Sequence, residues 1–304
     1  MRLKRVLPLA ALMLCTSTVA GTAPALADPQ VSPTPSGGPL RILLTNDDGY
    51  NAPGIRKAFD RLTAAGHDVT IVAPLTNQSG TGTKMASAPT VTVKHPEPKV
   101  WAVDGTPGDS VAFGLAQVFA GRAPDLVVSG TNFGPNVAGL ANHSGTVGGA
   151  VAALENGVPA IALSTGGTSA PDPVTTVNAM GPTLDFAVKL IDRLRSRARS
   201  GPLLPQGVGL NVNHPVVGAD GKGTAAGVSA TFQDPQTVLE PEYADAGDGT
   251  WKMTVKVALR PAARGGDVEA VSAGRIAVSP INADWNTGPA DAAVTAALLA
   301  GLRP

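Results

Sequence analysis

Short apolar runs alternate with helix-length stretches from Leu40 to about position 212. Six runs have the length and composition of buried strands: Arg41–Leu44, Val69–Val72, Val100–Val103, Asp125–Ser129, Ala160–Ser164 and Val208–Val212. Four stretches between them are long enough for helices: Pro53–Ala65, Gly108–Ala120, Thr146–Asn156 and Thr176–Arg199. Strands that alternate with helices of this length predict βαβ units, and hence an α/β domain with a mostly parallel sheet flanked by helices.

The pattern changes after about Thr224. Three strand-like segments, "GTAAGVSATF", "WKMTVKVALR" and "GRIAVSPI", follow one another without a helix between them, and Ala290–Leu302 has the composition of a closing helix. A turn around Gly247–Gly249 predicts an extended β-hairpin. We therefore expect a β-rich C-terminal arm at about residues 224–285, of a kind that packs on a neighbouring subunit.

The first 27 residues have the pattern of a secretory signal peptide. A basic start precedes a mostly apolar run at residues 6–20, and Ala25-Leu26-Ala27 matches a cleavage pattern. The apolar run is short for a membrane span, so we expect cleavage after Ala27, a secreted or extracytoplasmic protein, and no membrane span in the mature chain. Residues 28–39, "DPQVSPTPSGGP", predict a flexible Pro/Ser/Gly leader, and residues 40–304 are the expected folded domain.

The composition limits the classes of function. The chain of 304 residues is 43% hydrophobic, which is enough to fill the core of one large domain. Cleavage after Ala27 removes three basic residues and the chain's only cysteine, and leaves 20 Lys+Arg against 23 Asp+Glu, a formal charge of 20 − 23 = −3. The mature protein must therefore be stable without disulfides. Its near-neutral charge and 4% aromatic content argue against a nucleic-acid groove, so small-molecule ligands remain.

Small oxygen-bearing residues follow three of the predicted parallel strands. They are Thr45–Gly49 after the first strand, "APLTNQSGTGT" after the second, and "GTNFGPNVAGLANHSGTVGGA" after Asp125–Ser129. Because ligands in open parallel sheets bind beyond the carboxyl ends of the strands, we expect these three loops to converge. Carboxylate, amide and hydroxyl oxygens suit Mg²⁺, Mn²⁺ or Ca²⁺, and the chain has too few Cys and His for a soft-metal site.

Two neighbouring aspartates, Asp47 and Asp48, follow the first predicted strand. Like charges this close raise each other's pKa, whereas a bound cation would favour both ionised forms; a solvated turn is the alternative explanation. Ser144, Gly145 and Thr146 begin a predicted helix, where exposed N–H groups bind anions such as phosphate, although serine there is also an ordinary N-cap. A hard cation beside an anion-binding helix start indicates phosphate-ester hydrolysis, in which the metal polarises the phosphoryl oxygen and lowers the pKa of bound water.

Seven blocks of this chain, in their order and approximate spacing, resemble the SurE family of stationary-phase survival proteins. The blocks are "RILLTNDDGYNAPGI", "IVAPLTNQSGTGT", "WAVDGTPGDSVAFGL", "PDLVVSGTNFGPN", "HSGTVGGAVAALENGVPAIALS", "LNVNHP" and "GRIAVSPI". The resemblance runs from about Leu40 to the C-terminus. It implies metal-dependent 5′/3′-nucleotidase activity on nucleoside monophosphates. It also implies a Rossmann-like domain with a C-terminal swapped β-arm that forms homodimers or homotetramers.

The resemblance also implies roles for individual residues. The family binds one divalent cation, Mg²⁺ or Mn²⁺ with Ca²⁺ as a further candidate, through residues that match Asp47, Asp48, Ser79 and Asn132 here. Asp47 and Asp48 are the candidate catalytic residues, with Asp47 orienting or deprotonating the attacking water. The residues expected near the substrate phosphate are Asn46, Gly80, Asn136, Ser144, Gly145 and Thr146.

Two departures from the family pattern bear on substrate choice. His143, a candidate substrate contact because it directly precedes the predicted anion site, stands where the family commonly has tyrosine, and "VAGLAN" lacks the acidic residues often found in that stretch. The family is also usually intracellular, whereas this chain carries a predicted signal peptide. The hypothesis is therefore an exported phosphomonoesterase that acts on nucleoside monophosphates.

The sequence leaves two alternatives open. One is a broader phosphatase that acts on short polyphosphate or sugar phosphates, and the other is a nucleotide-binding protein without catalysis. A haloacid-dehalogenase-type phosphatase is disfavoured, because its first strand ends in D-x-D rather than in adjacent aspartates.

Overall fold

The computed structural model describes residues 38–86, 89–167, 172–198, 201–236, 239–258, 260–286 and 288–300. The predicted signal peptide and all but the last two residues of the predicted leader lie outside these ranges, so both stay predictions. None of the helices in the described ranges is long and apolar enough to cross a membrane.

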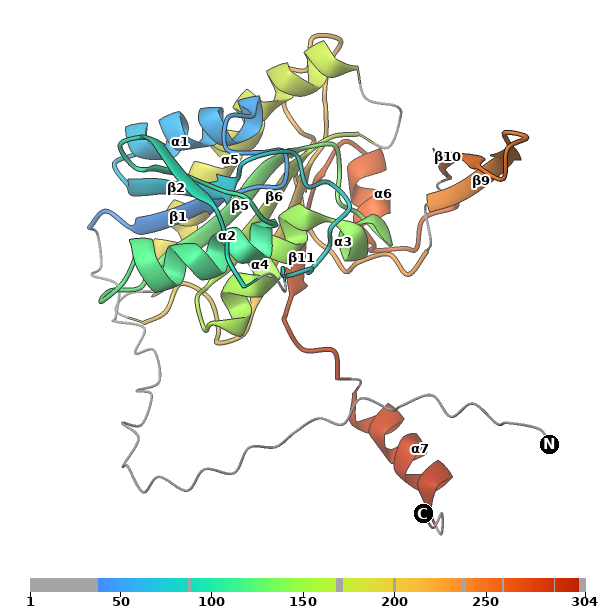
Figure 1. Cartoon of the computed structure of the whole chain (residues 1–304). Coiled ribbons are helices and arrows are strands. Elements are labelled where there is room, and N and C mark those ends of the chain that lie inside the picture. The colour runs from blue at the N-terminus through green and yellow to red at the C-terminus, as the bar shows by residue number, and fades with distance from the viewer. Residues whose placement is uncertain are drawn as a thin grey trace, which may run out of the picture. The chain divides into compact units, whose positions relative to one another are not determined.

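A nine-stranded sheet forms the centre of the domain (Figure 1). Its strands are β1 (Arg41–Thr45), β2 (Asp68–Pro74), β3 (Val93–Glu97), β4 (Val100–Val103), β5 (Leu126–Phe133), β6 (Ala160–Thr165), β7 (Gly209–His214), β8 (Val228–Ala230) and β11 (Ile276–Ile281). They lie in the order β3-β4-β2-β1-β5-β6-β7-β11-β8, and all neighbours are parallel except β3 with β4 and β11 with β7. The predicted α/β fold with a mostly parallel sheet is therefore confirmed.

The chain reverses its direction of travel across the sheet at β1. From β1 it moves outward through β2 and β4, and it then returns to the other side of β1 with β5, β6 and β7. The carboxyl ends of β1 and β5 therefore flank the switch point, which is where open α/β sheets bind their ligands.

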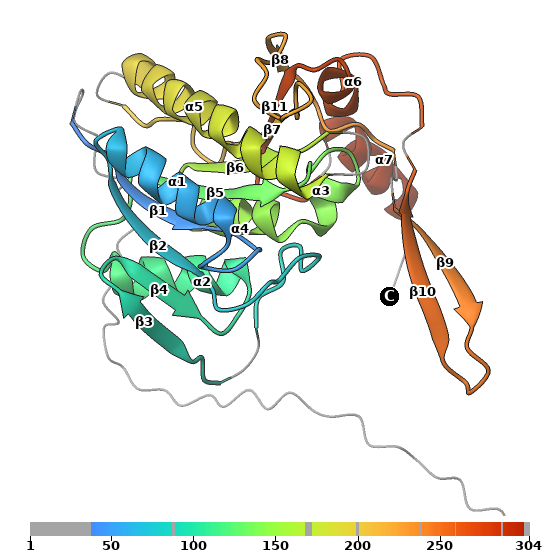
Figure 2. The same cartoon turned by 90° about the horizontal axis from the view of Figure 1, so that it is seen from above.

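Two helical layers cover the sheet (Figures 1 and 2). Helices α1 (Pro53–Ala64) and α5 (Pro173–Ala198) pack on one face, and α2 (Pro107–Phe113) and α4 (Gly145–Glu155) pack on the other. Side chains along β1 alternate between the two cores, with Ile42 and Leu44 in the first and Leu43 in the second. A strand buried on both faces has to be apolar throughout, which explains why β1 was visible in the sequence as a continuous run.

The sequence predictions differ from the structure in three places. The strand expected at Asp125–Ser129 continues to Phe133, so "GTNF" belongs to a strand and not to a loop. Helix α6 (Asp267–Ser272) lies between the second and third of the late strands, where no helix was expected, and its six residues are too few to show a helical period. Strand β3 was missed because it is an edge strand with mostly exposed residues.

Helix α2 continues as one π-helical turn, η1 (Gly114–Val118), and the two together match the helix predicted at Gly108–Ala120. The short helix α3 (Leu140–His143), which was not predicted, directly precedes α4. Helix α7 (Pro289–Leu299) matches the predicted closing helix as far as the structure describes it.

The predicted hairpin consists of β9 (Leu239–Asp245) and β10 (Trp251–Val257), which pair antiparallel in a sheet of their own. Tyr243 faces Met253 across the ladder, and both are exposed. The alternate positions are polar, and there Lys256 and Glu242 form an ion pair of 2.6 Å. Within the predicted arm, however, β8 and β11 join the central sheet, so the separate β-structure is confined to the hairpin.

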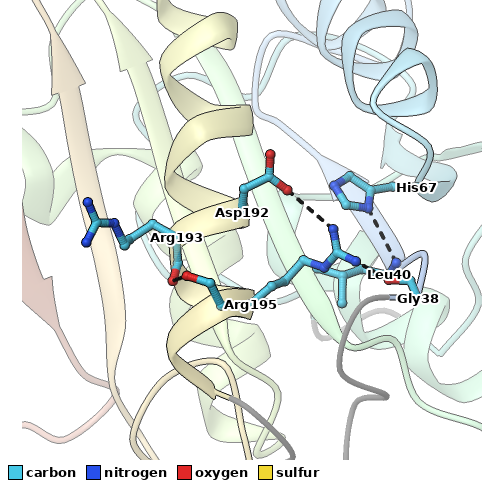
Figure 3. A network of polar contacts seen from close by, with 7 residues as sticks. Gly38, Leu40, His67, Asp192, Arg193 and Arg195 are labelled. Carbon is cyan, nitrogen blue, oxygen red and sulfur yellow. Dashed lines mark hydrogen bonds and ion pairs between the residues drawn. The ribbon is translucent and has the colours of Figure 1, made fainter.

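A polar network holds the start of β1 against the end of α5 (Figure 3). The guanidinium of Arg195 donates to the carbonyl of Gly38 and pairs with Asp192, while the Nδ1 of His67 accepts from the backbone N–H of Leu40 at 3.4 Å. His67 is buried, and its Nε2 has no partner among the described residues. Burial, and then the nearby positive charge of Arg195, lower the pKa of His67 below its ordinary value.

Candidate functional site

The first strand places two carboxylates at the switch point. Strand β1 ends at Thr45, and the chain then turns through Asn46, Asp47 and Asp48. Asn46 is fully buried and Asp47 is 3% exposed, so the explanation of this stretch as a solvated turn fails. The side chain of Asn46 closes the turn, because its Nδ2 donates to the carbonyl of Gly49 at 3.0 Å.

Asp47 receives its hydrogen bonds from the start of α4. The hydroxyl of Thr146 donates to Asp47 Oδ1 at 2.6 Å, and backbone N–H groups of Gly145 and Thr146 also favour the ionised carboxylate. Burial is the larger effect, so the pKa of Asp47 is raised despite these donors. The side chain of Ser144 accepts from the N–H of Val147 at 3.2 Å, which makes Ser144 the N-cap of α4.

Asp48 is coupled to Asp47 and to the end of β5. Burial, and then the charge of Asp47, raise the pKa of Asp48 to about 6. The backbone N–H of Phe133 donates to Asp48 Oδ2 at 3.3 Å and partly offsets this. The sequence-based expectation that the two carboxylates raise each other's pKa therefore holds for Asp48.

The loop after β2 packs against both Asp47 and α4. The N–H of Gln78 donates to the carbonyl of Asp47 at 2.7 Å, and the N–H of Gly82 donates to the carbonyl of His143 at 3.1 Å. Between these anchors, Ser79 and Gly80 are exposed, and the N–H of Ser79 donates to Asn77 Oδ1 at 2.8 Å. The structure therefore places Ser79 one residue from a direct contact with Asp47.

Two glycines of α4 allow this close approach. A Cβ at Gly145 would lie 2.7 Å from the Cβ of Asp47 and 2.9 Å from the hydroxyl of Thr81. A Cβ at Gly148 would lie 1.9 Å from the carbonyl oxygen of Gly82. The loops after β1 and β2 and the start of α4 thus meet, as the sequence predicted.

The third polar segment contributes from the end of β5. Asn132 lies in this strand beyond an irregularity of register, and its Nδ2 donates to the carbonyl of Gly134 at 2.9 Å. Its neighbour Phe133 contacts Asp48, so Asn132 adjoins the carboxylate pair. The side chain of Asn136 is engaged elsewhere, because its Nδ2 donates to the hydroxyl of Ser164 at 2.9 Å. His143 is exposed at the end of α3.

Sequence reasoning missed two residues of this region, Asn211 and Asn213 on β7. Both are buried and both donate to the carbonyl of Asn136. Their signal in the sequence was the polar alternation in "LNVNHP", at the carboxyl end of an otherwise buried strand.

The residues present fit a hard divalent cation. Asn46, which directly precedes the two aspartates in the chain, has a buried Oδ1 without a partner among the described residues. No group of three or more His, Cys, Asp and Glu side chains in the described ranges is arranged to hold a metal, so a cation here needs amide and hydroxyl oxygens as well as Asp47 and Asp48. Such an all-oxygen set suits Mg²⁺, Mn²⁺ or Ca²⁺ rather than zinc.

The fold, together with the acidic residues that follow β1 at the switch point, defines a Rossmann-like α/β protein with a largely buried acidic site. The chain belongs to the SurE family: the family model described as Survival protein SurE matches residues 42–240. The resemblance noted in the sequence is therefore confirmed.

Relatives share this match over most of their length. The 5'-nucleotidase SurE of Caulobacter sp. (strain K31) is 35% identical over 265 residues, which cover 85% of this chain and 94% of the relative. The 5'-nucleotidase SurE of Paramagnetospirillum magneticum is 36% identical, covering 86% and 93%. The crystal structure of the Sure protein from Aquifex aeolicus aligns with a TM-score of 0.70 at 27% identity, over 84% of this chain and 98% of that one.

Proposed function

We propose that this chain hydrolyses nucleoside 5′-monophosphates, and 3′-monophosphates as well, to nucleoside and phosphate. The observation that carries the proposal is the carboxylate pair at the switch point, in a chain of this family: buried Asp47, which accepts from Thr146 at the start of α4, and half-buried Asp48. The relatives named 5'-nucleotidase support the choice of substrate. One divalent cation, Mg²⁺ or Mn²⁺, would be held by Asp47, Asp48, Ser79 and Asn132.

The bound cation would supply a Lewis acid that polarises the phosphoryl oxygen and acidifies a water. Asp47 would orient the attacking water or accept its proton, and the hydrogen bond from the hydroxyl of Thr146, which fixes the carboxylate in one orientation, supports this role. The phosphate would lie at the exposed Gly80 and beside the start of α4, where the N–H groups of Gly145 and Thr146 act on Asp47 and that of Val147 on Ser144. The exposed His143 is the candidate contact to the nucleoside.

We further propose that the mature protein is exported and acts outside the cytoplasm as a homodimer or homotetramer. Export rests on the basic, apolar and A-x-A segments of residues 1–27. Oligomerisation is supported by the exposed apolar side chains of the β9–β10 hairpin, among them Tyr243, Trp251 and Met253. N-terminal sequencing of the secreted protein and its mass in solution test these two points.

The deciding experiment measures phosphate release from AMP by the chain Asp28–Pro304 in EDTA, Mg²⁺ or Mn²⁺. Release should require the cation, and Asp47→Asn or Asp48→Asn should abolish most of it while the protein stays folded. Asp60→Asn, which changes an exposed carboxylate on α1, is the matched control and should keep full turnover. Full turnover by either site variant would refute the cation site.

A substrate panel separates the alternatives. Comparing kcat/KM for AMP, 3′-AMP, tripolyphosphate and a hexose phosphate distinguishes a nucleotidase from a broader phosphatase. Thermal stabilisation by AMP without any phosphate release would instead indicate a binding protein and would contradict the proposed hydrolysis.

A further inference from the structure

Strand β7 carries two buried asparagines whose side-chain amides take no part in the backbone hydrogen bonds between β7 and its neighbouring strands. Asn211 and Asn213 are each 1% exposed. A buried amide without partners costs about 1–3 kcal/mol per group, so an apolar residue would suit this strand better unless the amides are used. Among the described residues, every hydrogen bond that these two amides make leads to Asn136, while Asn211 Oδ1 has no partner there.

Asn213 binds both backbone groups of Asn136. Its Oδ1 accepts from the N–H of Asn136 at 2.6 Å, and its Nδ2 donates to the carbonyl of the same residue at 3.1 Å. Asn211 donates a further bond to that carbonyl at 2.8 Å. With both main-chain groups held by one rigid amide, Asn136 has little freedom to rotate or shift.

The segment 134–136 is also bound to β6. The N–H of Gly134 donates to the carbonyl of Thr165 at 2.8 Å, and the side chain of Asn136 donates to the hydroxyl of Ser164 at 2.9 Å. Gly134 and Asn136 are thus fixed to the two strands that lie beyond β5 in the sheet.

This segment orients Asn132. The carbonyl of Gly134 accepts from Asn132 Nδ2 at 2.9 Å, which settles which end of that amide is occupied. The other end, Oδ1, has no hydrogen-bond partner among the described residues and is available to an external one. Oxygen is the end that a hard cation requires, so the direction of the Asn132 amide decides whether it can serve as a ligand.

We propose that Asn213 is a positioning residue for the cation site: by clamping Asn136 it fixes the carbonyl of Gly134, which in turn presents the oxygen of Asn132 to the cation. The inference rests on the proposed function, because it needs Asn132 to be a ligand. Residues that orient metal ligands typically change metal affinity about 10–100-fold when they are removed.

The test measures Mn²⁺ binding by calorimetry, without substrate. Asn213→Ala should weaken Mn²⁺ binding about 10–100-fold, and Asn132→Ala should weaken it as well. The double variant should bind no more weakly than Asn132→Ala alone, because Asn213 acts only through Asn132. Additive losses, or unchanged affinity in Asn213→Ala, would overturn the proposal.

Ile191→Val is the stability control. Ile191 is fully buried on α5 and directly precedes Asp192 of the network at the start of β1, whereas Ser164, Asn211 and Asn213 lie on strands β6 and β7, so the change costs only packing, about 0.5–1.5 kcal/mol. This variant should lower the Tm while leaving Mn²⁺ affinity unchanged. A loss of Mn²⁺ affinity that occurs in Asn213→Ala and not in the control therefore cannot result from a general loss of stability.

Two further outcomes are distinguishable. If Asn213→Ala does not fold, Asn211→Ala removes only one of the two donors to the Asn136 carbonyl and should show a smaller loss of Mn²⁺ affinity; wild-type affinity in that variant would refute the clamp. If the wild-type chain itself binds no Mn²⁺, the proposed cation site fails and this inference fails with it. If the wild-type chain binds Mn²⁺ and Asn213→Ala binds it equally tightly, the positioning role of Asn213 is refuted while the proposed cation site stands.

Discussion

Gly148 of α4 offers a direct test of how the loop after β2 is seated. A Cβ at this position would lie 1.9 Å from the carbonyl oxygen of Gly82 and 2.6 Å from its carbon. Both atoms belong to backbone, so no side chain can rotate away. In Gly148→Ala the loop must therefore retreat by about 1 Å, or the helix must shift by as much.

The magnitude follows from two opposing effects. Forcing a methyl group into a packed region costs about 1–3 kcal/mol, and a clash with backbone belongs at the upper end of that range. Alanine is favoured over glycine inside a helix by about 1 kcal/mol, so we expect a net loss of about 2 kcal/mol. For a domain of this size that lowers the Tm by roughly 4–8 °C. A 1 Å displacement of Ser79 and Gly80 should also reduce turnover by about 100-fold.

The assay combines thermal unfolding with phosphate release from AMP in Mn²⁺. Gly181→Ala is the control, because Gly181 lies in α5 and, its chain neighbours apart, nothing lies within 4 Å of the added Cβ. The following Pro182 disfavours a helical residue that carries a Cβ, which offsets the usual gain of alanine over glycine, so the Tm should change little and turnover should stay unchanged. If Gly148→Ala matched wild type in both Tm and rate, the close contact between α4 and the loop would be wrong.

Further predictions concern single interactions. Thr146→Val removes the bond to Asp47 and should weaken Mn²⁺ binding about tenfold or more, whereas Thr146→Ser should keep it; equal affinities would contradict this. The pKa of His67 is lowered from 6.5 in the folded protein, so below pH 6.5 the unfolded chain binds a proton at this residue more readily than the folded chain does. The free energy of unfolding should therefore fall as pH drops below 6.5. Urea unfolding at two pH values should show a smaller fall in His67→Gln. Lys99→Ala breaks an exposed ion pair with Asp68 and should change stability by less than about 1 kcal/mol, which a large Tm shift would refute.

Much of the sheet could be predicted from the sequence because β1, β2, β5 and β6 are buried on both faces. Continuous apolar runs are the direct consequence of that burial. The edge strand β3 and the six-residue helix α6 could not be found in this way. An exposed edge needs no apolar period, and fewer than two helical turns cannot display one.

The candidate site shows the same limit. The sequence revealed Asp47, Asp48 and the start of α4. Adjacent aspartates directly after a buried strand, and small residues at the first turn of a helix, are recognisable from neighbouring residues alone. Asn213 did not, since its partner Asn136 is 77 residues away in the sequence. Only the pairing of β5, β6 and β7 brings these two residues together.

The paired carboxylates carry a cost that the fold only partly offsets. Asp47 has the Thr146 hydroxyl and Asp48 the N–H of Phe133, yet the pKa of each is raised, that of Asp48 to about 6. A carboxylate whose folded pKa lies above its ordinary value of 3.8 destabilises the protein at pH 7, and this penalty disappears as pH falls to about 4.

Asp48→Asn should therefore stabilise the cation-free protein at pH 7 by about 1–3 kcal/mol, and should give no gain at pH 4. Mn²⁺ should raise the Tm of wild type but not of the variant, because a bound cation offsets the charge that the variant lacks. Thermal unfolding of both proteins in EDTA and in Mn²⁺ measures these shifts. A variant less stable than wild type in EDTA at pH 7 would mean that the protein itself already compensates the charge of Asp48. The pair would then be an element of the fold, and the strongest physical reason for placing a cation at this switch point would be gone.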